Sequence, residues 1–318
     1  MDIIDTHCDA LLKLQQDDRK AYDDGEKAFN FYDSPEIETN VLRLREGGVK
    51  VQFFAIFIPP EVPDNEKWQH ALEQVDCFYN EVLSQENFIH IKNLKEIEGL
   101  KPEEIGAVLT LEGADAVGND LMKLRTLFRL GVLSVGLTWN NANLVADGVG
   151  ENRDAGLSGY GERFVASCNA HGVLIDISHL CPKGVTEVLE LGDRIIATHS
   201  NSRSVCDHRR NLTDDQIRRV IEKGGMINIV FNPPFIGEGK IKIEDVFSHI
   251  DKIINLGGEE AIGLGSDFDG ITCHVERLGN AGEYGNLIDA LKERYGETFT
   301  EKIAYGNFVE KYCKSDLL

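Results

Sequence analysis

The sequence predicts a (β/α)8 barrel, and three observations support this prediction. Eight short apolar stretches recur along the 318-residue chain, and a segment of helical periodicity follows most of them. These stretches are hydrophobic almost throughout, as in parallel strands that are covered on both faces. The chain length suits one barrel of this kind, in which the functional site lies at the carboxyl ends of the strands. We therefore expect residues 1–318 to form a single-domain α/β TIM barrel.

The predicted strands alternate with helices that carry recognisable terminal signals. Thr213 is placed to cap a helix that reaches Lys223, and Pro182 stands in the first turn of another helix. Gly47 follows a helix that begins at Asn40. We expect strands at residues 3–9, 49–58, 107–113, 133–139, 173–179, 194–199, 226–231 and 261–267, and helices at residues 10–16, 40–46, 66–85, 120–130, 162–171, 182–191, 213–223, 243–256, 287–295 and 300–311.

An open, doubly wound sheet is the alternative architecture. Such sheets usually carry a glycine-rich phosphate-binding turn after the first strand. No Gly-x-Gly-x-x-Gly motif follows any predicted strand, and no phosphate-binding loop is present in the sequence. The closed barrel is therefore the preferred prediction.

The charge of the chain restricts its partners. The net charge is −21 at pH 7, and the isoelectric point is near 4.8. An acidic surface repels nucleic acid and anionic membranes, so we expect neither as a partner. The sequence leaves the oligomeric state open, with a homodimer as one alternative.

The cysteines and the apolar segments predict a location. Seven cysteines are scattered without a Cys-x-x-Cys pair, which is typical of a reduced, cytosolic protein. The first strand begins at Ile3, which leaves no room for a signal peptide. No apolar run approaches the roughly 20 residues that span a bilayer. We expect a soluble, cytoplasmic protein.

The first predicted strand ends in a candidate metal-binding pair. Residues at positions i and i+2 of a strand point to the same side, so His7 and Asp9 can converge while Cys8 points away. An imidazole and a carboxylate together suit a divalent transition metal such as zinc. A surface turn after a short buried strand is the alternative interpretation of this stretch.

The ends of later strands favour the metal site. Histidine or carboxylate residues stand at the ends of strands three, five, six and eight, and burying them is costly unless they are paired or bind metal. Three histidines and two carboxylates suffice for two metal ions that share a bridging carboxylate, about 3.5–4 Å apart. The residues of these later strand ends are Glu112, His179, His199 and Asp267.

An ordered set of motifs resembles the membrane (renal) dipeptidase family, a branch of the amidohydrolase superfamily. The resemblance runs from the first to the eighth predicted strand and covers nearly the whole chain. The motifs are His7-x-Asp9, Leu111-Glu112-Gly113, Asp176-Ile177-Ser178-His179, Thr198-His199-Ser200, Arg209-Arg210-Asn211 and the run from Gly265 to Gly270.

The resemblance implies a zinc-dependent barrel hydrolase that cleaves dipeptides with two Zn²⁺ ions per chain. His7, Asp9 and a bridging Glu112 would hold one zinc ion. Glu112, His179 and His199 would hold the other. By the same resemblance, Asp267 matches the aspartate that handles the proton of the bridging water, and Arg210 matches the arginine that binds the carboxylate of the substrate.

One position departs from the family. Mammalian members carry a histidine after Leu-Thr at the end of strand four, where it contacts the scissile carbonyl oxygen. This chain has Trp139 there, followed by Asn140. An indole has a single hydrogen-bond donor and cannot carry charge. Trp139 is therefore expected to donate to the developing oxyanion or to form a pocket wall, and Asn140 is the alternative donor.

We therefore predict a binuclear zinc metallopeptidase in which a metal-bridging hydroxide attacks the peptide carbonyl and Asp267 relays the proton. The alternatives are hydrolysis of another amide, a lactam or an ester by the same groups, or a metal-binding protein without turnover. Asp267 favours an enzyme, because a non-catalytic protein has little use for a proton relay beside a complete ligand set. Four further histidines on helices or loops, namely His70, His90, His171 and His249, are expected at the surface.

Overall fold

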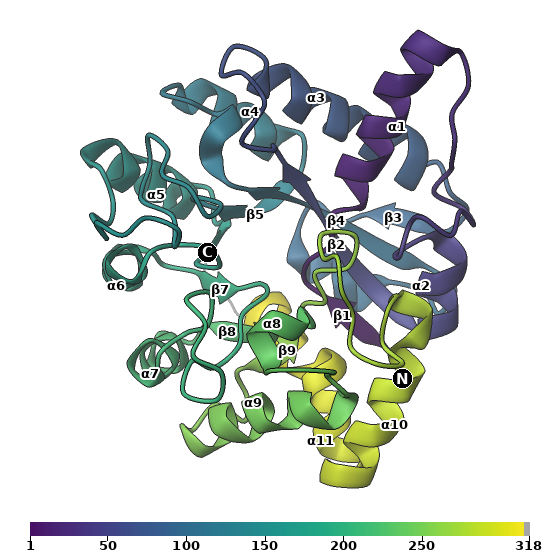
Figure 1. Ribbon diagram of the computed structural model, residues 1–318, viewed down its shortest axis with the longest axis vertical. Coiled ribbons are helices and arrows are strands. Elements are labelled where there is room, and N and C mark those ends of the chain that lie inside the picture. The colour runs from purple at the N-terminus through teal and green to yellow at the C-terminus, as the bar shows by residue number, and fades with distance from the viewer. Residues whose placement is uncertain (315–318) are drawn as a thin grey trace.

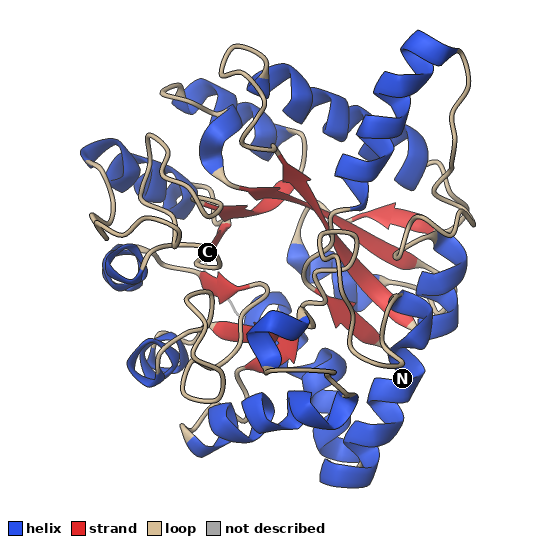
Figure 2. Cartoon of the chain, in the orientation of Figure 1, coloured by secondary structure: helices blue, strands red, loops and turns tan. Residues whose placement is uncertain are grey.

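The chain folds as a closed (β/α)8 barrel, which confirms the predicted fold class (Figure 1). The computed structural model describes residues 1–314. Eight parallel strands close into a ring in the order β2-β1-β9-β8-β7-β6-β5-β4, and β4 pairs with β2 to complete it. The helices surround this ring of strands (Figure 2).

The strands are short and buried along almost their whole length. β1 and β6 each show three consecutive buried residues, and all eight residues of β4 are buried. This is the pattern of parallel strands that are covered on both faces. The strands are β1 (Ile3–Asp5), β2 (Val49–Phe57), β3 (Phe88–His90), β4 (Ile105–Glu112), β5 (Val132–Gly136), β6 (Leu174–Asp176), β7 (Ile195–Ala197), β8 (Met226–Ile229) and β9 (Ile262–Leu264).

Most helices follow the sequence signals for their ends. Thr213 and Gln216 form a capping box at the start of α7, and Pro182 is the first residue of α6. The helices are α1 (Ala10–Asp24), α2 (Val41–Gly47), α3 (Lys67–Cys77), α4 (Leu121–Arg129), α5 (Gly159–Ala170), α6 (Pro182–Leu191), α7 (Asp214–Glu222), α8 (Pro233–Ile236), α9 (Ile243–Asn255), α10 (Tyr284–Tyr295) and α11 (Glu297–Glu301).

Two predicted helices do not continue as regular α-helix. The segment after α3 becomes a π-helical turn at Phe78–Val82. The segment after α11 forms two such turns, at Lys302–Gly306 and Val309–Cys313. None of the described helices is long and apolar enough to cross a membrane.

A ninth strand, β3, was not predicted. It has only three residues, and it pairs with Ile105–Ala107 at the start of β4, outside the ring. Its histidine, His90, is therefore part of a strand and half-buried, not a surface residue. The expectation for His249 was also wrong: it is fully buried on α9, and its ring bonds Ser202 and Ile236.

The hydrophobic core has two parts. One part lies between the strands and the outer helices. The other part lies inside the ring, where Ile4, Phe53 and Leu174 pack with Phe308 and Tyr312 from the segment after α11. The Phe53 and Phe308 rings meet edge to face at 5.5 Å, and the Tyr312 hydroxyl donates to the Ile195 carbonyl at the start of β7. Residues 308–313 therefore plug the amino-terminal end of the barrel, opposite the end that carries the predicted site.

Candidate metal centre

All six residues predicted at the strand ends meet at the carboxyl-terminal end of the barrel. Five of them are buried, with at most 8% of each residue exposed, and Asp267 is partly buried. Cys8 points away, as predicted, and lies in the core between strands and helices. The six residues that the structure brings together are His7 and Asp9 after β1, Glu112 at the end of β4, His179 after β6, His199 after β7 and Asp267 after β9.

The two carboxylate oxygens of Glu112 face two different groups of side chains. Its Oε2 lies 3.7 Å from His7 Nε2, while its Oε1 lies 3.0 Å from His179 Nε2 and 3.6 Å from His199 Nε2. His7 Nε2 also lies 3.4 Å from Asp9 Oδ2. Within each of the two resulting triads, the potential ligand atoms lie within 4.8 Å of one another.

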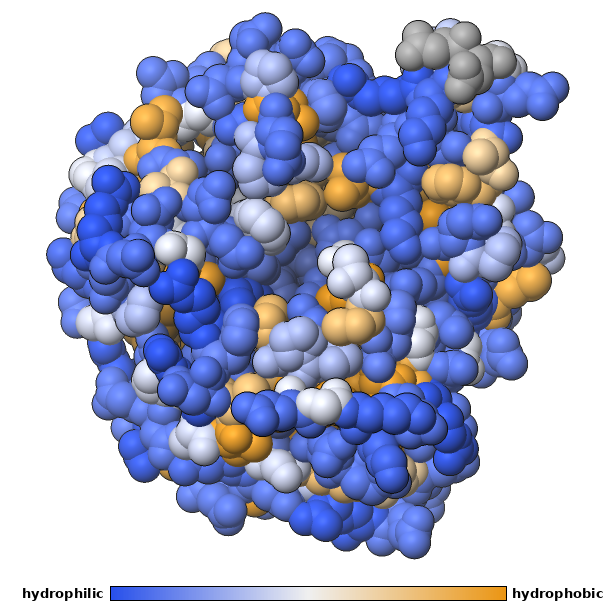
Figure 3. Space-filling model, viewed as in Figure 1, coloured by the Kyte–Doolittle hydropathy of each residue, from blue (hydrophilic) through white to orange (hydrophobic). Residues whose placement is uncertain are grey.

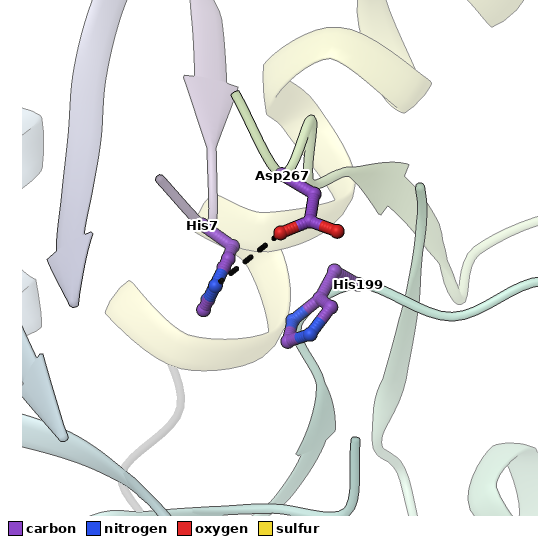
Figure 4. A group of neighbouring side chains, drawn as sticks. All are labelled: His7, His199 and Asp267. Carbon is purple, nitrogen blue, oxygen red and sulfur yellow. Dashed lines mark ion pairs between the residues drawn. The ribbon is translucent and has the colours of Figure 1, made fainter. Parts of the chain in front are cut away.

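A third arrangement links the two triads. His7, His199 and Asp267 also place their ligand atoms within 4.8 Å of one another (Figure 4). His7 Nε2 lies 3.8 Å from Asp267 Oδ1, and the His7 and His199 rings stack with their centroids 3.8 Å apart. The cluster is therefore continuous, with His7 and Glu112 at its centre.

The buried charges perturb one another strongly. Burial and the nearby Asp9 raise the pKa of Glu112 well above its usual value. Burial also raises the pKa of Asp267 to about 7, although His7 opposes the change. Burial by itself lowers the pKa of His7, but the carboxylates of Glu112 and Asp9 outweigh this effect and raise the pKa to about 10. Three carboxyl groups in one buried cluster favour the binding of cations.

Two buried polar atoms without hydrogen-bond partners indicate a metal-binding site here. Among the described residues, His7 Nε2 and Asp9 Oδ1 have no hydrogen-bond partner, which is costly for buried groups. The Nε2 atoms of His179 and His199 face each other at 2.9 Å, beside Glu112 Oε1. Imidazole nitrogens and carboxylate oxygens that converge in this way are the donors that zinc prefers. The residues present therefore fit divalent metal ions.

The backbone at this end of the barrel is held in unusual conformations. His179 and Asp267 have φ angles of 67° and 66°, in the left-handed region. This conformation costs about 1–2 kcal/mol for an L-residue, and such strain clusters at functional sites. A Cβ atom on Gly270 would lie only 2.1 Å from Asp9 Oδ2, so the loop after β9 needs glycine to pack against the cluster.

A cavity of about 240 Å³ opens onto the cluster. Trp139 and Asn140, the predicted substrate contacts, both line it. The Trp139 ring packs between Phe57 and His179, with centroid distances of 5.4 and 5.9 Å. The amide oxygen of Asn140 lies 2.8 Å from His179 Nδ1, so Asn140 orients a predicted metal ligand in addition to lining the cavity. The molecular surface in Figure 3 is mostly hydrophilic and is hollowed near its middle.

Arg210 lies beside the cavity but does not line it. Its guanidinium is 5.5 Å from the ring of Phe235, which does line it. Arg210 is only 5% exposed, and its Nη2 donates to the His199 carbonyl at 3.2 Å. Its Nε has no hydrogen-bond partner among the described residues. A buried guanidinium with an unused donor fits the binding of an anion.

Two apolar residues of the cavity were not predicted as site residues. Leu12 and Phe57 line it from α1 and the end of β2. Phe57 carries a signal that would have found it, because it is the last residue of a barrel strand. Leu12 lies on a helix, and its sequence position does not distinguish it from a core residue.

Comparison with known proteins agrees with this geometry. A family model described as membrane dipeptidase, peptidase family M19, matches residues 1–312. An uncharacterised dipeptidase of Schizosaccharomyces pombe is 31% identical, over 93% of this chain and 76% of its own length. Rat Dipeptidase 3 is 27% identical over 98% of this chain, which spans 64% of the length of the rat protein.

Solved structures show the same architecture. A metallopeptidase from Rhodobacter sphaeroides, solved with a phosphinate mimic of the dipeptide L-Ala-D-Ala, superposes with a TM-score of 0.86 at 26% identity, over 98% of this chain and 99% of the other. An M19 metallopeptidase named dipeptidase AC gives a TM-score of 0.85 at 28% identity, over 98% and 99% of the two chains. The family match over nearly the whole chain confirms the resemblance that the motifs indicated: this chain belongs to the membrane dipeptidase family, peptidase family M19.

Proposed function

We propose that this chain is a binuclear zinc dipeptidase. The observation that carries the proposal is Glu112, whose two oxygens face separate groups of potential metal ligands. A single carboxylate in this position suits a bridge between two ions. The family match and the metallopeptidase structures support a metal-dependent dipeptidase, and the proposal adds the identity and number of the ions.

In this proposal, each triad holds one Zn²⁺ ion. His7, Asp9 and Glu112 would hold one ion, and Glu112, His179 and His199 the other. When bound, the ions would lower the pKa of a water molecule and polarise the peptide carbonyl. The protein supplies a buried, preorganised set of donors that would fix the positions of both ions.

Asp267 is proposed as the proton acceptor. It lines the cavity, and its Oδ1 lies 3.8 Å from His7 Nε2, at the centre of the cluster. A general base works best when its pKa is near the working pH. Burial raises the pKa of Asp267 to about 7, which suits an oxygen that takes a proton and passes it to the leaving amine.

Arg210, Trp139 and Asn140 are proposed to bind the dipeptide. The guanidinium of Arg210 would pair with the free carboxylate of the substrate, which lets the enzyme measure substrate length. Trp139 forms a wall of the cavity, and its indole can donate one hydrogen bond. The dipeptide mimic bound to the Rhodobacter sphaeroides relative supports a ligand of this size.

The Glu112→Gln substitution tests the shared bridge. Loss of a residue that only hydrogen-bonds a metal ligand typically lowers metal affinity by roughly 10–100-fold. Because Glu112 is proposed as a direct ligand of both ions, we expect this substitution to lower the affinity for each ion by more than that. An amide cannot provide two anionic oxygens. Elemental analysis and zinc titration of the purified variant would measure the effect, with the exposed Glu103→Gln as the matched control. A variant that still holds two tightly bound ions would contradict the bridge.

A further inference from the structure

The second ring nitrogen of His199 is held by a buried relay of two residues. Thr198 Oγ1 lies 2.8 Å from His199 Nδ1 and 2.5 Å from Asp176 Oδ2. Asp176, Thr198 and His199 are 5%, 2% and 0% exposed, so water does not compete for these contacts. Asp176 and Thr198 do not belong to either triad.

The hydrogen bonds of this relay have a defined direction. Asp176 Oδ1 already accepts from the backbone N–H groups of Ser178 and Thr198, both at 2.9 Å. A carboxylate only accepts hydrogen bonds, so the hydroxyl of Thr198 must donate its single hydrogen to Asp176 Oδ2. Its oxygen can then only accept from His199, which places the ring hydrogen on Nδ1.

This direction determines which His199 nitrogen carries a free lone pair. With hydrogen on Nδ1, the lone pair of Nε2 points toward Glu112 Oε1 and His179 Nε2. We propose that Asp176 and Thr198 are positioning residues that fix His199 in the tautomer able to bind a metal ion. This inference rests on the proposed function, because it assigns the ion to the triad of Glu112, His179 and His199.

His179 is held differently. Its Nδ1 faces the side-chain amide of Asn140, on the long loop after β5. An amide has both an acceptor and donors, so it can accommodate either tautomer by turning over. The relay from Asp176 has no such freedom, because two backbone N–H groups fix its acceptor side. The contacts of Asp176 and Thr198 therefore fix the tautomer of His199, whereas the Asn140 amide does not fix that of His179.

The Asp176→Asn substitution should invert the tautomer. The two backbone N–H groups require the amide oxygen, so the amide NH₂ must face Thr198 Oγ1. The hydroxyl would then turn its hydrogen toward His199 Nδ1, and the ring hydrogen would move to Nε2. We expect zinc affinity at this triad to fall by about 10–100-fold, the usual effect of losing an outer partner.

Long-range ¹H–¹⁵N NMR of histidine-labelled, metal-free protein reads the tautomer directly, and competition with a chromophoric chelator measures zinc affinity. The wild type should show hydrogen on His199 Nδ1, and Asp176→Asn should show it on Nε2. Thr198→Val should lose the fixed tautomer and the zinc affinity, whereas Thr198→Ser, which keeps the hydroxyl, should retain both. This pair tests the relay even if Asp176→Asn does not fold.

An unchanged tautomer in Asp176→Asn, or wild-type zinc affinity in both Asp176→Asn and Thr198→Val, would overturn the relay. A wild-type protein that binds no zinc would instead overturn the proposed function. The two failures are distinguishable, because the NMR comparison uses metal-free protein.

Discussion

Replacing Asp267 with asparagine is expected to lower kcat for dipeptides by about 10²–10⁴-fold, the usual contribution of a general acid–base group. The amide has nearly the same shape but cannot accept the proton. Asp267 is in neither proposed zinc triad, so both ions should remain bound. Steady-state kinetics with a dipeptide, together with the metal content of the same preparation, measure the two effects separately.

The exposed Asp289→Asn substitution on α10 provides the matched control, and it should leave both quantities unchanged. Two outcomes would contradict the assignment. Near wild-type turnover would show that Asp267 is not the proton acceptor. A loss of turnover that follows a loss of metal would show that its role is in holding the ions.

Replacing Arg210 with alanine is expected to reduce kcat/KM for dipeptides by roughly 30- to 5,000-fold. This corresponds to the loss of about 2–5 kcal/mol that results from truncating one partner of a buried, hydrogen-bonded charge pair. The same variant should affect dipeptide amides far less, because they lack the carboxylate. Arg210→Lys should recover only part of the loss, since an ammonium group cannot form the two parallel hydrogen bonds of a guanidinium.

The neighbouring Arg209→Ala is the matched control. Arg209 is exposed and donates to the Gly150 carbonyl and to Asn152, so its loss should change little. Because Arg210 also bonds the His199 carbonyl, metal content must be measured in parallel. If dipeptides and their amides suffer equally from Arg210→Ala, Arg210 does not bind the substrate carboxylate.

The barrel and its cluster were predictable because both follow from local sequence. Apolar stretches such as the one around Leu109 identify buried parallel strands, and parallel strands bring their carboxyl ends to one face. A residue at such an end, like Glu112 or His199, is therefore placed in space by its position along the chain. Neither prediction needed a side-chain distance.

Other features depend on contacts that the sequence does not encode locally. β3 has only three residues and is defined by its pairing with β4. The ring of His249 is buried where it hydrogen-bonds the backbone of Ser202 and Ile236, which lie 47 and 13 residues away along the chain. The relay from Asp176 to His199 joins residues at the ends of two neighbouring strands, so its hydrogen-bond directions appear only once the strands are in register.

The plug formed by residues 308–313 has a consequence for folding. The interior core groups Ile4, in the first strand, with Phe308, which lies near the other end of the described residues. Contacts of such long sequence separation form late, because the entropy of closing the loop must be overcome first. The interior should therefore be completed in one cooperative step. Ribosome-bound chains of increasing length should become resistant to protease only after this segment has emerged, and shorter chains should expose the open interior and aggregate.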